Sequence, residues 1–234
     1  MNTQPLKLFS PRVLFFDRYD AGKKLAVELK KYAGSDAVIM AIPRGGVAVA
    51  SPISRELHLP LDVLIVRKIP IPGNPEMGMG AITSDGSVLL DEPLLRELGI
   101  TAQRAERIAA SVKLEMQRRV HLYRGDKPYP DLSNRTVILV DDGLATGFTM
   151  LAAIKSMKGK KVSRLVIAVP VSSFQAFSVV SRQADEFITL AIQEAPEFAV
   201  ASFYREWSDM SDEEVLDLLS KNKDFNNAGE RLSD

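Results

Sequence analysis

Val137-Ile-Leu-Val-Asp-Asp-Gly-Leu-Ala-Thr-Gly-Phe-Thr149 is the stretch of the chain that decides its fold. Its first four residues are apolar and predict a buried β-strand. The apolar spacing of residues 150–157, which follow it, predicts a helix. Asp141 and Asp142 therefore stand at the carboxyl end of a strand, and a loop of small and hydroxyl residues leads from them into a helix.

This strand–loop–helix unit has the physical properties of a site for a sugar phosphate. A helix N-terminus offers unpaired backbone N–H groups and a partial positive charge, which attract a phosphate. Gly143 and Gly147 let the backbone approach a ligand closely, and Thr146 and Thr149 add hydroxyl donors. The two carboxylates would repel a phosphate, but they can accept hydrogen bonds from sugar hydroxyls or face a cation. A ribose 5-phosphate satisfies both halves of the unit.

The same motif resembles the signature loop of the type I phosphoribosyltransferases, which bind phosphoribosyl pyrophosphate. That family has four apolar residues, two acids and a loop ending Thr-Gly-x-Thr/Ser, and all of these are present at 137–149. The adenine branch is the nearest in this loop because it also has Ala-Thr-Gly after the acids. The hypoxanthine–guanine branch has an Asp, its proposed general base, where this chain has Ala145.

Two other interpretations of the motif are weaker. Receiver domains of signalling proteins also open with Val-Asp-Asp after an apolar strand, but they place it on the first strand of the domain. Here much of a plausible domain precedes residue 137. An ordinary buried strand with a solvated turn would not require the run of matching positions in the loop.

Composition limits the class of protein further. The 234 residues suit one α/β domain, which we place at 1–220 with a flexible tail at 221–234. Acidic and basic residues number 30 each, which does not favour nucleic-acid binding. There is no cysteine, so disulfides and cysteine zinc sites are excluded. We find neither a secretory leader nor a stretch long enough to span a membrane, and we expect a cytoplasmic protein.

A second strand–loop–helix unit begins at residues 37–42. Its loop is Pro43-Arg44-Gly45-Gly46, and Pro52 predicts that the helix begins near residue 48, so that the proline lies in the first turn. The carboxyl ends of parallel strands share one edge of a sheet, where open α/β folds bind ligands. The resemblance implies that Arg44, Gly45 and Gly46 hold the pyrophosphate, often with a non-proline cis peptide. A cis bond at Arg44-Gly45 stays an open question.

A third strand is expected at 61–66, with Arg67 and Lys68 at its end. The following residues, 69–80, are rich in proline and glycine and predict a loop. By its place, this loop resembles the flexible loop that closes over the pyrophosphate in the family. Arg67 and Lys68 are then cationic candidates for the pyrophosphate, and the weaker alternative is that both are solvated charges at a strand end.

The loop continues into a predicted hairpin, because Asp85-Gly86 separates two short apolar runs. Asn74 and Glu76, within the loop, are candidates to reach the acceptor base. Residues 101–122 predict a long helix whose basic residues form a solvated face, or alternatively the surface of a homodimer.

Near the N-terminus we expect a helix over 21–32 with Asp20 as its N-cap. We interpret Asp17 and Arg18 as an ordinary ion pair. Toward the C-terminus, strands at 162–169 and 186–190 bring the number of buried strands to five.

The aromatic residues of 191–207 resemble the family's hood over the acceptor base, or else cover the sheet edge. Ser211-Asp-Glu-Glu214 predicts a capped helix, and the chain from Asn222 onward is expected to be frayed.

We therefore predict an α/β fold with a five-stranded, mostly parallel sheet, helices on both faces, a small hairpin with a flexible loop, and a C-terminal hood. The resemblance implies a transferase in which a nitrogenous base displaces pyrophosphate from phosphoribosyl pyrophosphate with Mg²⁺ as cofactor. Asp141 and Asp142 would hold the ribose hydroxyls. The 5-phosphate would be held by Ala145, Thr146, Gly147, Phe148 and Thr149.

No protein ligand to a metal is assigned, and the acceptor base is not identified. The loops most resemble a bacterial branch that shares Asp-Arg near the N-terminus, Pro-Arg-Gly-Gly and Pro-Gly-Asn-Pro-Glu. The alternative is a non-catalytic regulatory protein that senses phosphoribosyl pyrophosphate or a nucleotide on the same fold.

Overall fold

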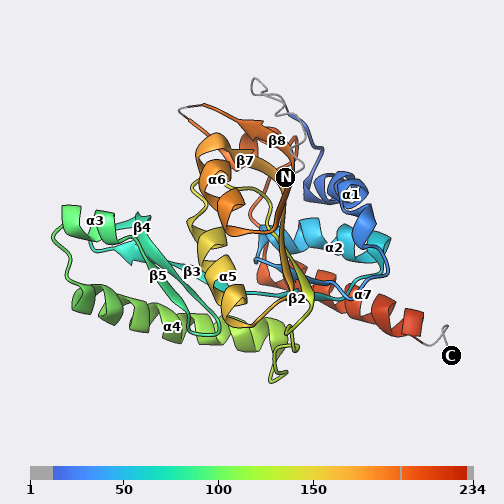
Figure 1. The fold of residues 1–234 in the computed structure, drawn as a ribbon, viewed down its shortest axis with the longest axis horizontal. Coiled ribbons are helices and arrows are strands. Elements are labelled where there is room, and N and C mark those ends of the chain that lie inside the picture. Colours follow the sequence, from blue (N-terminus) through green and yellow to red (C-terminus); the bar gives the residue numbers. More distant parts are fainter. Residues whose placement is uncertain (1–12, 196, 231–234) are drawn as a thin grey trace.

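The computed structural model describes residues 13–195 and 197–230, without the side chains of 74–77, 115 and 223–230. Its centre is a parallel sheet of five strands in the order β2-β1-β6-β7-β8 (Figure 1). The strands are β1 (Val38–Ala41), β2 (Leu61–Val63), β6 (Thr136–Val140), β7 (Arg164–Ser173) and β8 (Glu186–Gln193). The predicted α/β class, with five parallel strands, is confirmed.

Helices cover both faces of this sheet. One face carries α1 (Arg18–Glu28) and α2 (Gly45–Leu57), and the other carries α5 (Phe148–Gly159) and α6 (Phe174–Val180). Alternate residues of β6 pack on opposite faces of the sheet. Ile138 and Val140 belong to the core under α2, and Val137 and Leu139 belong to the core under α5. Because β6 is buried on both sides, its sequence is continuously apolar.

Both helices of the first face begin earlier than the sequence predicts. The N-cap of α1 is Asp17, whose side chain accepts from the Asp20 backbone N–H at 2.7 Å, so Asp20 lies inside the helix. The α2 helix begins at Gly45 rather than near residue 48 and contains Pro52 in its interior. The α1 helix approaches closely there, since a Cβ on Gly22 would lie 2.5 Å from Pro52 Cγ. Packing against α1 thus offsets the loss of a helical hydrogen bond at the proline.

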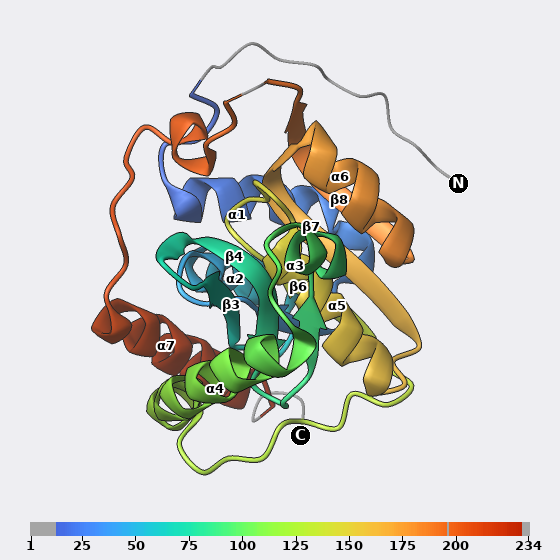
Figure 2. The same cartoon turned by 90° about the vertical axis from the view of Figure 1, so that its left-hand side faces the viewer.

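Residues 66–124 form an arm that extends from the sheet (Figures 1 and 2). It contains β3 (Val66–Ile71), β4 (Asn74–Thr83), β5 (Val88–Leu90), α3 (Glu92–Glu97) and α4 (Ala102–Arg124). The three strands form a separate antiparallel sheet in the order β3-β4-β5. The predicted long helix and the predicted turn at Asp85-Gly86 are both confirmed.

The arm corrects two expectations. The predicted third core strand is divided, since β2 ends at Val63 and β3, which begins at Val66, pairs with β4 instead. Residues 69–80 are not a long loop but most of a β3–β4 hairpin. Pro70 is tolerated there because β3 is an edge strand with an irregular register at this residue.

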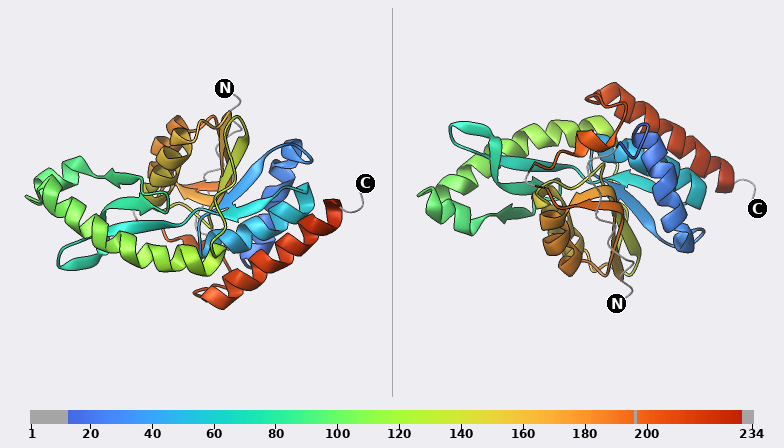
Figure 3. Two further views of the ribbon diagram at one scale, coloured as in Figure 1. Left: turned by 90° about the horizontal axis from the view of Figure 1, so that it is seen from below. Right: turned by 90° about the horizontal axis from the view of Figure 1, so that it is seen from above.

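The C-terminal segment crosses the first face of the sheet. The short helix η3 (Val200–Phe203) leads to α7 (Asp212–Glu230), which packs beside α2 (Figure 3). The predicted capping box is confirmed, with Ser211 and Glu214 exchanging backbone-to-side-chain hydrogen bonds of 2.6 and 3.1 Å. Asn222 is buried and donates to Ser51 Oγ at 2.9 Å, so the expected fraying at this residue is wrong.

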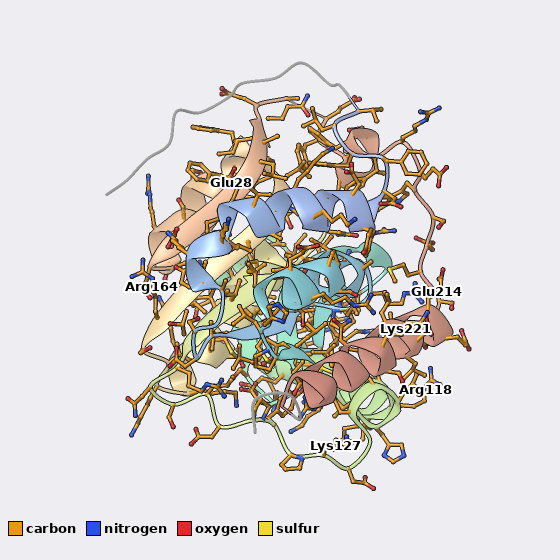
Figure 4. All side chains as sticks on the ribbon, turned by 90° about the vertical axis from the view of Figure 1, so that its right-hand side faces the viewer. Glu28, Arg118, Lys127, Arg164, Glu214 and Lys221 are labelled. Carbon is orange, nitrogen blue, oxygen red and sulfur yellow. The ribbon has the colours of Figure 1, made fainter. Side chains whose placement is uncertain are left out.

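The surface around α4 and α7 carries charges of both signs. Figure 4 labels Arg118, Lys127 and Lys221 on the same side of the molecule as Glu214. This mixture matches a solvated face better than a basic patch. In the part of the chain that the structure describes, no helix has the length and apolar character needed to cross a membrane.

Candidate functional site

The two glycine loops meet at the carboxyl edge of the sheet because β1 and β6 are neighbouring parallel strands. A Cβ on Gly45 would lie 1.8 Å from Asp142 Oδ2, and a Cβ on Gly46 would lie 2.7 Å from the Val140 carbonyl oxygen. Only residues without a side chain permit this approach. The structure therefore brings Asp141, Asp142, Gly45 and Gly46 together, although the two loops are far apart in sequence.

The loop after the acids leads into α5 as the sequence predicts. Gly147 is the residue before the helix and has φ +80°, a conformation that favours glycine. Ala145 and Thr146 are exposed, while Phe148 and Thr149 form the first turn of α5. The Ser173 hydroxyl donates to the Ala145 carbonyl at 2.7 Å and so ties the loop to the end of β7. The exposed loop and the helix N-terminus form a place where an anion can bind.

Asp141 and Asp142 form a closely spaced acidic pair. The Asp142 backbone N–H donates to Asp141 Oδ1 at 2.9 Å. Burial raises the pKa of Asp141 well above its ordinary value, and the neighbouring Asp142 charge raises this pKa further. Burial also raises the pKa of Asp142, although the Arg18 guanidinium opposes that shift. The pair therefore favours contact with hydrogen-bond donors or a cation.

Arg18 is the principal residue of the site that the sequence did not reveal. Its Nε donates to Asp142 Oδ2 at 2.8 Å, and its Nη1 donates to the Ser208 carbonyl at 2.9 Å. The expected ion pair with Asp17 is wrong, because Asp17 caps α1 and thereby directs Arg18 toward the acids. The partner is 124 positions away in sequence, so no local pattern indicates this contact.

The C-terminal segment lies against the same acids. The Tyr204 hydroxyl donates to the Asp142 carbonyl oxygen at 2.6 Å, and the Arg18 guanidinium carbon stacks 3.7 Å from the centre of the Trp207 ring. Phe203 and Tyr204 are buried in a core with Phe15, so they cover the sheet edge rather than present a free ring. Of the two roles predicted for the aromatic residues of 191–207, Phe203 and Tyr204 fulfil the covering of the sheet edge.

Arg44, predicted for the pyrophosphate, lies directly before α2. Its side chain is 36% exposed and approaches Asp212 with a separation of 3.9 Å between Nη1 and Oδ1. A non-proline cis peptide is present in this loop, but it joins Pro43 to Arg44 rather than Arg44 to Gly45. Arg44 thus reaches from the loop toward α7, at the margin of the site.

Arg67 and Lys68 do not stand at the end of a core strand, so this expectation is wrong. They lie within β3, opposite Ile82 and Ala81 of β4. The stem of Lys68 covers Gly78, where a Cβ would lie 2.3 Å from Lys68 Cγ. Both cations therefore belong to the arm. A role at the pyrophosphate stays a prediction for them.

A cavity of about 500 Å³ adjoins the 145–149 loop. It lies between this loop and the carboxyl ends of β7 and β8. Residues from all three segments line it, including Thr146, Ser173, Phe174, Gln193, Glu194 and Phe198. A cavity of this volume holds a ligand of the size of a small heterocycle.

The acidic pair also bears on metal binding. Among the residues whose side chains the structure describes, no three or more His, Cys, Asp or Glu gather to hold a metal ion. Two carboxylates without a third ligand fit Mg²⁺, which keeps several waters and takes its remaining ligands from substrate phosphates. The residues present thus fit a magnesium ion that arrives with a substrate.

Comparison with known proteins identifies the family. The family model of the phosphoribosyl transferase domain matches residues 17–201. Two Mycobacterium tuberculosis proteins, from strains CDC 1551 and H37Rv, are 37% identical over 217 residues, and their names assign them provisionally as phosphoribosyl transferases. The crystal structure of TT1426 from Thermus thermophilus has a TM-score of 0.74 at 36% identity, covering 88% of this chain and 98% of that one.

The chain therefore belongs to the phosphoribosyl transferase family, as the 137–149 motif predicts. The matches to the two mycobacterial proteins cover 92% of this chain and 49% of theirs, so the chain spans about half the length of these curated relatives.

Proposed function

We propose that this protein is a phosphoribosyltransferase that transfers the phosphoribosyl group of phosphoribosyl pyrophosphate to a nitrogenous base. The observation that carries this proposal is the junction of the two glycine loops at the acidic pair. The 145–149 loop is suited to the 5-phosphate, because it is exposed and leads into a helix N-terminus. Asp141 and Asp142 are suited to the ribose hydroxyls, and the Arg44–Gly46 loop to the pyrophosphate.

In the proposed reaction, a nitrogen lone pair of the base attacks the anomeric carbon of the ribose. The bond from this carbon to the pyrophosphate oxygen breaks, and its electron pair leaves with pyrophosphate. A proton carried by the attacking nitrogen passes to solvent, whereas a pyridine-type nitrogen without a proton becomes cationic in the product. Positive charge develops on the ribose ring in the transition state, and the nearby carboxylates of Asp141 and Asp142 would stabilise it.

Mg²⁺ would be held by the substrate's pyrophosphate and ribose oxygens with the acidic pair beside it. When bound, it would neutralise charge on the leaving pyrophosphate. We expect the protein to act in the cytoplasm. A homodimer and the limits of the domain at 1–220 stay predictions.

A sensor that binds phosphoribosyl pyrophosphate without turning it over is the second candidate. It is favoured by one observation, namely that Asp142 Oδ2 is already engaged by Arg18 at 2.8 Å. A catalytic protein must exchange or share this contact when the ribose binds. In a sensor, a change in this contact could transmit ligand binding from Asp142 through Arg18 to the C-terminal segment.

Pyrophosphate release from phosphoribosyl pyrophosphate, measured with a panel of bases with and without Mg²⁺, separates the two candidates. We expect release that requires a base and Mg²⁺, and that falls at least about a hundredfold in Asp141→Asn. Asp126→Asn serves as the control, because this exposed side chain lies at the end of α4, away from the sheet edge. Ligand binding without release for every base would favour the sensor.

A further inference from the structure

The cavity beside the 145–149 loop contains an unusual polar group, the side-chain amide of Gln193. Gln193 is 6% exposed and lines the cavity at the end of β8. Its amide makes no hydrogen bond to any residue that the structure describes. No atom of this amide is both completely buried and without a partner, so its one acceptor and two donors face the cavity. They are available to a ligand that occupies the cavity.

The position of Gln193 relative to the proposed ribose site is fixed by the sheet. Gln193 is paired with Ser173 in the parallel β7–β8 register. The Ser173 hydroxyl in turn donates to the Ala145 carbonyl, which belongs to the 145–149 loop. The Ser173 hydroxyl also accepts from the Ala176 backbone N–H at 3.0 Å, so its proton and one of its two lone pairs are used within the protein. The Gln193 amide therefore keeps more hydrogen-bonding capacity for a ligand than its neighbour Ser173.

The other walls of the cavity limit what this ligand can be. Phe174 and Phe198 supply aromatic surface, and a planar ring is the shape that such surface accommodates. Glu194, which is exposed, places a negative charge at the same cavity. A ligand that carries a carboxylate would face this charge and also the carbonyl oxygen of the Gln193 amide.

We propose that Gln193 determines which acceptor the protein takes, by selecting an uncharged planar nitrogen heterocycle with a hydrogen-bond donor beside an acceptor. Lactam, carboxamide and amidine edges have this pattern and form two complementary hydrogen bonds with an amide. Heterocycles with a carboxylate in that position present only acceptors and are disfavoured. This inference rests on the proposed phosphoribosyl transfer and names the class of its acceptor.

The test uses two pairs of bases. In nicotinamide and nicotinate a carboxylate replaces the carboxamide edge, and in uracil and orotate a carboxylate, which would face Glu194, is added beside an unchanged lactam edge. Each base is titrated calorimetrically into the protein saturated with ribose 5-phosphate and Mg²⁺, a mixture that has no leaving group and cannot turn over. We expect at least one neutral member to bind, and to bind at least about tenfold more tightly than its carboxylated partner.

Two variants assign the preference to Gln193. Gln193→Leu removes both hydrogen-bonding functions, and Gln193→Glu keeps the acceptors but removes the donors; each should weaken the neutral base at least about tenfold. Gln183→Glu is the matched control, since Gln183 lies in the turn before β8 and a glutamate can still accept from Lys158. Melting temperatures of all variants show whether they are folded.

The outcomes separate this inference from the proposed function. Binding of phosphoribosyl pyrophosphate is measured independently in each variant and should be unchanged by substitution at Gln193. If that binding is present but no base binds, or if both Gln193 variants retain the wild-type preference, the inference is overturned and the proposed function stands. If phosphoribosyl pyrophosphate itself does not bind, the proposed function fails.

Discussion

The parallel sheet and the arm differ in the burial and pairing of their strands, and the proposed site lies at the edge of the parallel sheet. In the sheet, β1 and β6 are short, fully apolar and buried on both faces, and each ends in a glycine loop. In the arm, β3 and β5 are only partly buried, and the strands pair antiparallel through tight turns. The sheet holds two loops against each other, whereas the strands of the arm pack on the arm's own helix α4 and on α5.

The two regions differ in the source of their stability. The sheet edge depends on contacts that admit no extra atom, as the distances at Gly45 and Gly46 show. The arm is joined to α5 by apolar packing, in which Val66 and Ala81 share a core with Met150 and Ile154, and also by polar contacts. Asp85 in its turn accepts from Ser156 at 2.7 Å, and Lys155 donates to the Val88 carbonyl at 2.7 Å. We therefore expect substitutions at the sheet edge to have larger effects than those at the arm.

The largest effect is expected for Gly46→Ala. The new Cβ would lie 2.7 Å from the Val140 carbonyl oxygen and 3.0 Å from Asp141 Cα, both backbone atoms that cannot move away separately. We expect a loss of about 3 kcal/mol in the free energy of unfolding, measured by urea denaturation. Gly159→Ala is the control, because a Cβ there meets nothing within 4 Å. Equal stability of the two variants would show that the loops are not tightly packed.

A second, smaller effect is expected for Arg18→Ala. This change leaves the Asp142 carboxylate, whose side chain is 18% exposed, without its cationic partner. We expect a loss of about 2 kcal/mol, less than for a fully buried pair. The only tryptophan, Trp207, stacks on Arg18, so its fluorescence should change in the folded variant.

The control for Arg18 comes from the arm. Arg96 faces Glu92 at 3.8 Å, and both side chains are more than two-thirds exposed, at 72% and 78%. Arg96→Ala should change the free energy of unfolding by less than about 0.5 kcal/mol. If this substitution costs as much as Arg18→Ala, the proposed difference between the sheet edge and the arm is wrong.

An effect smaller than that of Arg18→Ala is expected for Asp85→Asn, which weakens the link between the arm and α5. Burial alone would raise the pKa of Asp85, but the Thr83 and Ser156 hydroxyls and Lys160 together hold it at about 2, below the ordinary 3.8. The unfolded chain therefore binds more protons in this range, and the carboxylate's contribution is lost as pH falls from about 4 to about 2.

For Asp85→Asn we expect a loss of about 1 kcal/mol at neutral pH, measured by denaturation at a series of pH values. The difference from the wild type should shrink between about pH 4 and about pH 2, where the wild-type carboxylate becomes protonated. A difference that is constant across this range would mean that the charge of Asp85 does not contribute to attaching the arm.

The same comparison explains what the sequence could predict. The core strands and the 137–149 motif were predictable because a strand, its acids and the next helix are adjacent in the chain. The β3–β4 hairpin was not, because prolines and glycines at 69–80 indicate a break in regular structure equally well in a loop or an irregular edge strand. Its strands are defined by pairing with each other rather than by a local pattern.

Within the site, the sequence indicated the residues of the two glycine loops and missed the residues that distant segments of the chain contribute. Arg18 reaches Asp142 across 124 positions, and Tyr204 reaches the same residue across 62. Gln193 sits at the end of an apolar strand where its sequence context resembles any strand terminus. The N-cap position of Asp17 is a local signal against an ion pair with Arg18, but it does not indicate Asp142 as the partner.

We propose that the acidic pair and the two glycine loops bind phosphoribosyl pyrophosphate. The decisive experiment is thermal unfolding with and without this ligand and Mg²⁺, for the wild type and Asp141→Asn. Without ligand the variant should melt at or above the wild-type temperature, because burial and Asp142 raise the pKa of Asp141 and make its charge costly at neutral pH.

With ligand at about 100 times its Kd, the wild type should gain about 2.7 kcal/mol, a shift of several degrees, and the variant should gain little. Asp126→Asn, at an exposed position, should respond like the wild type. An equal ligand shift in the wild type and Asp141→Asn, or no shift in the folded wild type at millimolar ligand, would contradict the assignment of this edge as the phosphoribosyl pyrophosphate site.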